Sequence, residues 1–397
     1  MRIKRQIKYR IIKFCLIIIF SESLLDFKNK FPEISKIDNN TKIDNITKKP
    51  DFQNNSINYE NNTKLERNNN TIFKSKEIIY NNGSIKCKVD VMDEDKEAIP
   101  TNKKIIHVAM YFGEDYVVFP LVSITSAMIN CDKNNTILIY HLFSDTNAIK
   151  EMNILKSIKK KYKENVRLNF YKITNIFTEC FKWRGYTTNN LRLILPELLT
   201  NIDKIIYLDA DTLIFTDLTE LYNLPMNDNY VLGFPDILSS RLKLFRVNSN
   251  IYINSGTLLL NFTKIRNDKM SDKSITHYFT KYKKKLYFGD QDIINFEYNP
   301  KIGLLPLKYG IFLVHDIKKY IEMTRLKLNY TEFKEAKENP KILHLTQCEP
   351  KILSKEPKHI YGRQYDNVCK YGRDLFFKYA KFTEYYPYIA KKYNFND

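Results

Sequence analysis

Two aspartates, Asp209 and Asp211, offer the clearest chemistry in this sequence of 397 residues. They follow the apolar run 205–208, which predicts a buried strand. Side chains two residues apart on an extended chain point to the same face, so both carboxylates can reach one site. Two carboxylates at the carboxyl end of a strand suit a divalent cation that also holds a diphosphate.

The elements that must position these carboxylates alternate between short strands and helices. Predicted strands cover residues 104–110, 137–143, 166–171, 204–208, 230–234 and 256–261. Helical patterning covers residues 118–129, 147–161 and 190–199. This alternation predicts an α/β fold whose sheet is mainly parallel and Rossmann-like, with helices on both faces. The less regular second half is expected to carry the acceptor side.

The first hundred residues have a different composition. Residues 1–23 place basic side chains before a short apolar run, which predicts a signal peptide, with a short signal anchor as the alternative. Residues 24–100 are rich in Asn and Lys and have no sustained apolar period, which predicts a disordered stem. The catalytic domain is therefore expected at residues 101–397, and the leader predicts the secretory pathway (ER or Golgi lumen, or secretion).

The chain is basic, with a formal net charge of +19. Because zinc-finger spacing, RNP-like aromatic motifs and a P-loop are absent from the sequence, nucleic acid is not an expected partner. The interpretation we favour is a lysine-rich solvated surface. Residues 370–393 are rich in Lys and Tyr and leave peripheral membrane contact as an alternative. A disulfide between Cys348 and Cys369 would suit an oxidising lumen, but spacing does not determine the pairing.

Four further stretches place polar residues at the ends of predicted elements. They are residues 191–199 (LRLILPELL), 252–256 (YINSG), 289–295 (GDQDIIN) and 342–345 (ILHL). Together with the Asp-Ala-Asp run, their order and spacing resemble glycosyltransferase family 8 over residues 104–393. The resemblance implies a single catalytic domain of GT-A fold that transfers a sugar from a UDP-sugar with retained configuration. The sequence is similar to both bacterial glycan glucosyl- or galactosyltransferases and animal glucoside xylosyltransferases, and it does not separate these branches.

The resemblance also implies the cofactor-binding residues. Asp209, Asp211 and His344 would be ligands of a manganese ion, a mixed carboxylate and imidazole set that such an ion accepts. Lys351 would be a second cation on the diphosphate. The implied nucleotide- and sugar-binding set is Tyr116 against the uracil, Asp209, Ala210, Asp211, Ser255, Gly256 and Lys351.

Four residues are implied in catalysis. Asp290 would accept hydrogen bonds from sugar hydroxyls, Asn254 would frame the donor sugar, and Arg192 would lie near the phosphates or the sugar. Gln291 would lie beside the anomeric carbon, where its amide is a poor nucleophile. We therefore expect same-face attack by the acceptor, with the leaving phosphate taking the acceptor proton. Asp292, in the same run, is interpreted as a helix cap.

The sequence departs from the family pattern at two places. Gly113 stands where the family has an aspartate before the uracil-binding tyrosine, and Gln347 replaces a glycine shortly before Lys351. These departures leave a catalytically silent, glycan-binding relative as one alternative. The 28 tyrosines leave a glycogenin-like self-glucosylating protein as another. The donor sugar (hexose or pentose), the acceptor (glycan, glycoprotein or glycolipid) and the oligomeric state remain open.

Overall fold

The computed structural model describes residues 63–68, 71–80, 85–113, 116–144, 149–174, 191–282, 286–312, 317–346, 363–393 and 395. The predicted signal peptide, residues 24–62 of the predicted stem, and Lys351 lie outside this set. Within the described part of the chain, no helix has both the length and the apolar character needed to cross a bilayer.

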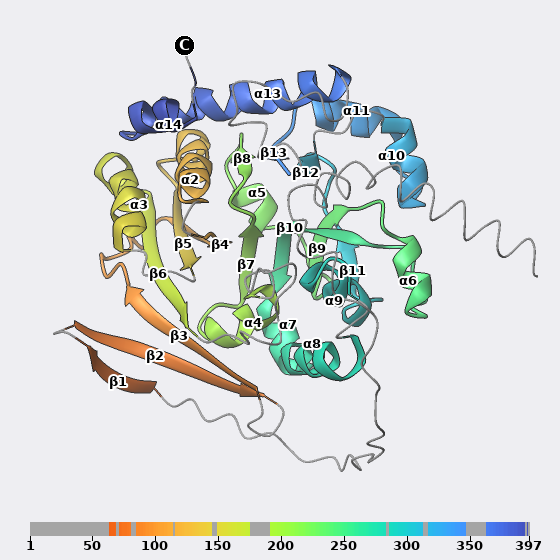
Figure 1. Ribbon diagram of the computed structural model, residues 1–397, viewed down its shortest axis with the longest axis horizontal. Helices are drawn as coiled ribbons and strands as arrows, with labels where there is room; N and C mark the ends of the chain where they lie inside the picture. The colour runs from red at the N-terminus through yellow and green to blue at the C-terminus, as the bar shows by residue number, and fades with distance from the viewer. Residues whose placement is uncertain are drawn as a thin grey trace, which may run out of the picture. The chain divides into compact units, whose positions relative to one another are not determined.

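A ten-stranded sheet forms the centre of the fold, in the order β1-β2-β3-β6-β5-β4-β7-β10-β9-β11 (Figure 1). Its four central strands, β6, β5, β4 and β7, run parallel, as the sequence predicts, and β10 is antiparallel to both β7 and β9. The strands are β1 (Thr63–Asn68), β2 (Thr71–Tyr80), β3 (Ile85–Asp93), β4 (Lys104–Tyr111), β5 (Thr136–Ser144), β6 (Val166–Thr174), β7 (Lys204–Leu208), β9 (Val231–Pro235), β10 (Ile253–Asn261) and β11 (Ile302–Leu304).

Helices cover both faces of this sheet because successive strand residues point to opposite sides. In β7, Ile206 and Leu208 join one core, and Ile205 and Tyr207 join the other. The first core also receives α2 (Val118–Asn130), α3 (Ile149–Tyr162), α5 (Thr219–Tyr222), α10 (Ile317–Thr324), α11 (Tyr330–Glu338), α13 (Arg363–Ala380) and α14 (Tyr386–Lys392). The second receives α4 (Leu191–Leu198), α6 (Ser240–Leu244), α7 (Phe262–Asn267), α8 (Met270–His277), the π-helix η4 (Tyr278–Tyr282) and α9 (Asp290–Glu297). Figure 1 shows α2 and α3 on the opposite side of the sheet from α4, α7 and α8.

A second, three-stranded sheet joins the end of β7 to a late segment of the chain. Its order is β12 (Tyr309–Phe312), β13 (Ile342–His344) and β8 (Thr212–Ile214). In the antiparallel β13–β8 pair, His344 lies opposite Thr212, and Leu345 N donates to Asp211 O at 2.9 Å. This register brings His344 to the segment that follows the central strand.

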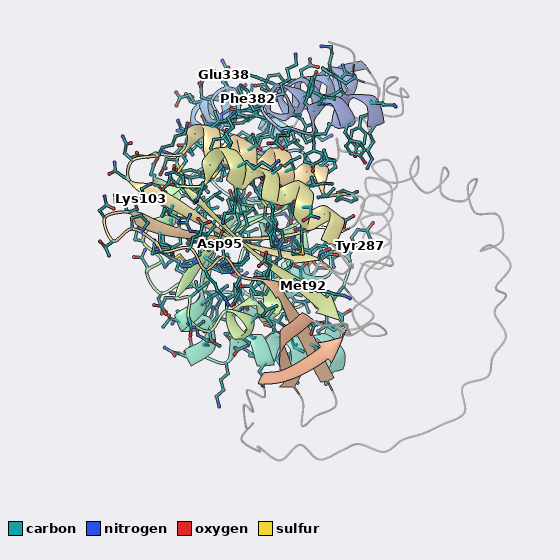
Figure 2. All side chains as sticks on the ribbon, turned by 90° about the vertical axis from the view of Figure 1, so that its left-hand side faces the viewer. Met92, Asp95, Lys103, Tyr287, Glu338 and Phe382 are labelled. Carbon is teal, nitrogen blue, oxygen red and sulfur yellow. The ribbon has the colours of Figure 1, made fainter. Side chains whose placement is uncertain are left out.

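The start of the folded domain differs from the prediction. Strands β1, β2 and β3 lie within the predicted stem, and β3 pairs with β6 as part of the main sheet. Residue Asp95, labelled in Figure 2, has a nearly buried side chain that lies 2.5 Å from Lys159 Nζ of α3. Apolar Ile85, Cys87, Val89 and Val91 alternate with polar residues, as expected for a strand with one buried face, but the surrounding Asn- and Lys-rich composition obscured this pattern.

Two neighbouring histidines, His141 buried and His107 partly buried, predict how the stability of the fold depends on pH. His107 Nδ1 lies 3.1 Å from His141 Nε2, and His141 Nδ1 lies 3.1 Å from Tyr171 OH. Burial lowers the pKa of His107 to about 4 and that of His141 to about 3. In the unfolded chain both imidazoles take up protons near their ordinary pKa of about 6.5. Stability that is present at neutral pH is therefore lost as the pH falls below that value.

We expect the free energy of unfolding to fall by at least about 2 kcal/mol between pH 7 and pH 4. Guanidinium unfolding at each pH measures this quantity. The double variant His107→Gln and His141→Gln removes both titrating groups, so its free energy of unfolding should change less over the same range. An identical pH profile in the double variant would assign the acid sensitivity to other groups.

Candidate active site

The three predicted metal ligands lie together at the carboxyl end of β7. Asp209 and Asp211 follow this strand, and β13 supplies His344. Nε2 of His344 is 3.2 Å from Asp211 Oδ1 and 3.6 Å from Asp209 Oδ2. One ligand atom from each of the three residues lies within 4.8 Å of the others. Among the described residues this is the group of acidic and histidine side chains close enough to hold a metal ion.

The geometry and chemistry of these side chains fit a divalent cation. Neighbouring ligands of an octahedral ion with bonds of about 2.1 Å lie about 3 Å apart, close to the separations between His344 and the carboxylates. The side chain of Asp209 is 27% exposed, whereas those of Asp211 and His344 are 11% and 5% exposed, so an ion can approach from the Asp209 side. Burial alone lowers the pKa of His344, but Asp211 and Asp209 together raise it above its ordinary value. A cation would replace the proton that these carboxylates attract.

Gly256 of β10 allows the ligands to approach one another. The β7–β10 register pairs Leu208 with Thr257, and Asp209 N donates to Gly256 O at 2.8 Å. A Cβ atom at position 256 would lie 2.2 Å from His344 Cε1 and 2.7 Å from Asp209 Oδ2. The space that a side chain would fill is occupied by two of the predicted metal ligands, so this position requires glycine.

Arg192 connects the metal ligands to the start of α9. Its Nη1 donates to Asp290 Oδ2 at 2.5 Å, and its Nη2 contacts Asp209 Oδ1. The guanidinium also lies 4.3 Å from the centre of the Tyr207 ring. Burial raises the pKa of Asp290 to about 6, although Arg192 acts in the opposite direction. In the structure, Arg192 thus orients the side chains of Asp209 and Asp290. Its predicted position near the phosphates or the sugar of the donor stays a prediction.

Gln291 has both ends of its amide fixed by hydrogen bonds. Its Oε1 accepts from Asn254 Nδ2 and from Ser255 N, each at 3.1 Å, and its Nε2 donates to Asp236 Oδ2 at 3.2 Å. The side-chain oxygen of Asn254 in turn accepts from Gly256 N at 2.8 Å. The run Asn254-Ser255-Gly256 therefore links the metal ligands to Gln291.

Asp236 belongs to this cluster, and the sequence analysis missed it. It is buried, and burial raises the pKa of its carboxyl group above the ordinary value. It directly follows β9, which runs parallel to β7 because both are antiparallel to β10. The reasoning applied to Asp209 would have found it, since the carboxyl ends of strands with the same direction meet at one edge of the sheet. A single carboxylate outside the recognised motifs gave too weak a signal.

Asp292 has a larger structural role than the predicted helix cap. Its carboxylate accepts two hydrogen bonds from Arg241, at 2.7 and 2.6 Å, and one from Tyr252 OH at 2.6 Å. It also accepts from the backbone N–H groups of Tyr287 and Phe288, at 2.7 and 3.0 Å. Asp292 therefore fixes the loop before α9 and, through it, the position of Asp290.

Tyr116 lies just after the end of β4, on the same edge of the sheet as Asp209 because β4 and β7 are parallel. The residue is 42% exposed, and its ring stacks on Phe119 with 5.4 Å between centroids. An exposed aromatic ring at this edge is compatible with the predicted uracil contact, which stays a prediction. Gly113 has no heavy atom within 4 Å of the position of a Cβ, so the backbone would also accept the aspartate of the family pattern.

Comparison with known proteins decides the family. The profile of glycosyl transferase family 8 matches residues 107–348, more than half of the chain. The chain belongs to glycosyltransferase family 8. The matched segment includes every predicted site residue except Lys351.

Relatives in this family act on several sugars. General stress protein A of Bacillus subtilis is 24% identical over 283 residues, 68% of this chain and 95% of the relative. Lipopolysaccharide 1,2-glucosyltransferase of Escherichia coli is 25% identical over 59% of this chain and 70% of the relative. Glucoside xylosyltransferase 2 of Mus musculus is 27% identical over 28% of this chain and 30% of the relative. A protein of Haemophilus influenzae is 34% identical, but the match spans only 33% of its length.

Solved structures of family 8 enzymes share the fold. The bifunctional glycosyltransferase WbbM superposes with a TM-score of 0.60 at 19% identity, covering 76% of this chain and 54% of WbbM. Galactosyltransferase LgtC, solved with donor and acceptor sugar analogs, has a TM-score of 0.54 at 18% identity, covering 70% of this chain and 96% of LgtC. At these identities the likeness establishes the GT-A architecture alone.

Proposed function

We propose that this family 8 glycosyltransferase is a retaining, manganese-dependent enzyme that moves a hexose or pentose from a UDP-sugar to an acceptor hydroxyl. The acceptor is a glycan, a glycoprotein or a glycolipid. The observation that carries the proposal is the convergence of Asp209, Asp211 and His344 within 4.8 Å at the ligand-binding edge of a GT-A sheet. The activities for which two relatives are named, glucosyl and xylosyl transfer, support a sugar donor of this size.

Residues of the chain would have two different roles around the diphosphate, metal binding and orientation. A divalent ion held by Asp209, Asp211 and His344 would act as a Lewis acid that takes up leaving-group charge. Arg192 holds Asp209 and Asp290 in fixed orientation through a buried ion pair with each. A preorganised arrangement of this kind avoids reorganisation during the reaction.

The structure supports same-face attack through the absence of a ready nucleophile in this cluster. The amide of Gln291 is held by Asn254, Ser255 and Asp236, and Asp292 receives five hydrogen bonds. The buried carboxylate of Asp236 accepts from Gln291 and from Asn254. Asp290 is paired with Arg192. We infer that the bond from the anomeric carbon to the phosphate breaks as the acceptor oxygen attacks from the same side. The acceptor proton passes to the departing phosphate oxygen.

Turnover of UDP-sugars tests this function. Purified protein is incubated with a panel of UDP-hexoses and UDP-pentoses, with and without manganese, and release of UDP is measured. We expect UDP to be released from one donor, and only when manganese is present. The NMR spectrum of the product should show that the anomeric configuration of the donor sugar is retained. An intact fold that releases no UDP from any donor would favour the catalytically silent, glycan-binding alternative.

Replacing Gln291 with alanine should separate chemistry from binding. We expect turnover to fall by about 100-fold, because the Gln291 amide lies beside the reacting carbon in this proposal and alanine cannot make its polar contacts. The affinity for UDP, measured by calorimetry, should change by less than about threefold. Equal losses of turnover and UDP affinity would mean that Gln291 serves the nucleotide instead.

We also propose that the protein enters the secretory pathway. The basic and apolar pattern of residues 1–23 supports this, and so does a disulfide bond at Cys369, because disulfides persist in oxidising compartments. Sequencing the N-terminus of protein expressed in a eukaryotic host distinguishes a cleaved leader from a retained anchor. Cytosolic protein with an intact N-terminus would contradict both.

Peripheral membrane contact is a further proposal, supported by the surface of α13, α14 and the turn between them. Tyr371, Phe382 and Tyr388 are 48–49% exposed on these C-terminal segments, beside several lysines. Interfacial aromatic rings and basic side chains favour an anionic bilayer surface. Pelleting with anionic vesicles should succeed at low salt and fail at 1 M salt, where charges are screened beyond about 3 Å. Equal pelleting with neutral vesicles would exclude electrostatic attachment.

A further inference from the structure

A cavity of about 530 Å³ lies at the carboxyl end of α9, away from the metal ligands. Its walls come from the loop after α6, from α8 with η4, and from the end of α9. Asp290 begins α9 in the active site, and Glu297 ends it at the cavity. Seven residues of helix separate these two positions by about 10 Å. The cavity is therefore distinct from the candidate active site.

Three cations and one carboxylate line this cavity. Oε1 of Glu297 accepts a hydrogen bond from Tyr282 OH at 2.5 Å and lies 2.8 Å from His277 Nδ1. The ammonium groups of Lys273 and Lys281 lie 3.6 and 3.7 Å from its oxygens, beyond hydrogen-bonding distance. Both lysine side chains are about half exposed. Their donors converge on the cavity and remain available to a ligand.

Arg246 supplies the third cation. Its side chain is exposed, lines the cavity, and forms no hydrogen bond or ion pair with any residue that the structure describes. Its backbone has a φ of 57°, a left-handed conformation that asparagine and glycine adopt more easily than arginine. Among the described residues that line the cavity, Arg246, Lys273 and Lys281 against Glu297 leave an excess of two positive charges.

The charge and size of the cavity indicate the ligand. A phosphomonoester carries a charge of about −1.5 to −2 at neutral pH, which matches the excess. The volume is far larger than a phosphate group and falls in the range of pockets that hold small organic ligands. Phe245, partly exposed, adds an apolar wall. An apolar wall beside a cluster of cations suits the ring of a phosphorylated sugar.

We propose that this cavity is a second binding site, for a phosphorylated saccharide. Arg246, Lys273 and Lys281 bind the phosphate, while Phe245 contacts the sugar ring. The site is independent of the donor-sugar site, so it can be occupied while a nucleotide is bound.

Calorimetric titration with glucose 6-phosphate, glucose and inorganic phosphate tests the site. Titrations are run on the full chain, with and without saturating UDP and manganese. We expect glucose 6-phosphate to bind at least tenfold more tightly than either glucose or inorganic phosphate, and equally well with UDP present. Binding that UDP abolishes would place the ligand in the donor site and overturn the proposal. Inorganic phosphate binding as tightly as the sugar phosphate would overturn the saccharide assignment.

Variants separate this site from general surface charge. The double substitution Lys273→Gln and Lys281→Gln should weaken binding of glucose 6-phosphate at least tenfold. Arg246→Asn should weaken it by the same factor. Because asparagine suits the left-handed backbone at this position, that variant should lose no thermal stability. Lys243→Gln, at an exposed residue of α6 outside the cavity, is the matched control and should bind as the wild type does. UDP-sugar turnover should survive in all variants. Unchanged affinity in both cavity variants would overturn the proposal.

Discussion

Replacing Asp211 with asparagine is expected to reduce manganese-dependent turnover of the UDP-sugar by about 1,000-fold or more. Asp211 Oδ1 lies 3.2 Å from His344 Nε2, so its charge is part of the candidate metal site. Lewis-acid stabilisation of the leaving group is worth several kcal/mol, and about 1.4 kcal/mol corresponds to a tenfold change in rate. Electron paramagnetic resonance of free manganese measures the accompanying loss of metal affinity directly.

Thermal unfolding gives a readout of this substitution that does not depend on turnover. Without a cation, the carboxylate of Asp211 still contacts His344, so the metal-free variant, which loses that charge, should unfold at the same temperature as the wild type or slightly below it. Manganese should stabilise the wild type and leave the variant unchanged, because ligand binding to the native state raises its stability. Asp228→Asn, at a carboxylate that is 74% exposed, is the matched control and should behave as the wild type. Full manganese affinity in the Asp211 variant would remove the metal assignment.

Replacing Gly256 with alanine is expected to disrupt the metal site through packing. The added Cβ would lie 2.2 Å from His344 Cε1 and 2.7 Å from Asp209 Oδ2, well inside van der Waals contact. Either β10 or the two ligands must move. We expect a loss of about 1–3 kcal/mol in the free energy of unfolding, typical of overpacking, and a loss of at least about tenfold in manganese affinity.

Gly113→Ala is the matched control for this prediction. No heavy atom lies within 4 Å of a Cβ at position 113, and its backbone does not require glycine. We expect the control to keep manganese affinity, and to match or slightly exceed wild-type stability because alanine restricts the unfolded chain. If Gly256→Ala bound manganese as tightly as this control, then His344 and Asp209 would not need the close approach seen in the structure.

Local sequence patterns identified much of the fold. Strand β7 has the predicted bounds, residues 204–208, and the other predicted strands and helices agree to within a few residues. Apolar periodicity is a property of neighbouring residues, which is why it can be read from the chain alone. Strand β3 was missed because it lies in an Asn- and Lys-rich region, although its side chains alternate as expected for a strand with one buried face.

The candidate site was recognised in part from spacing and in part from resemblance. Asp209 and Asp211 share one face because they are two residues apart on an extended chain, and no tertiary information is needed for that. The participation of His344 rested on resemblance to the family, since its distance from Asp211 depends on the register between β13 and β8. Asp236 and the buried pairs of Arg192 were not predicted, because each joins segments far apart in the sequence.

The sequence by itself determined the alternation of strands and helices, the paired carboxylates after the central strand and the family. The tertiary structure decided which distant residues meet: His344 beside the carboxylates, Gly256 where His344 and Asp209 leave no room for a Cβ, and the cations of the α9 cavity. Strand order and register set these contacts, and a shift of one residue would turn each strand's side chains to the opposite face. Lysines and arginines in a chain this basic carry no positional signal until the fold brings Arg246, Lys273 and Lys281 together.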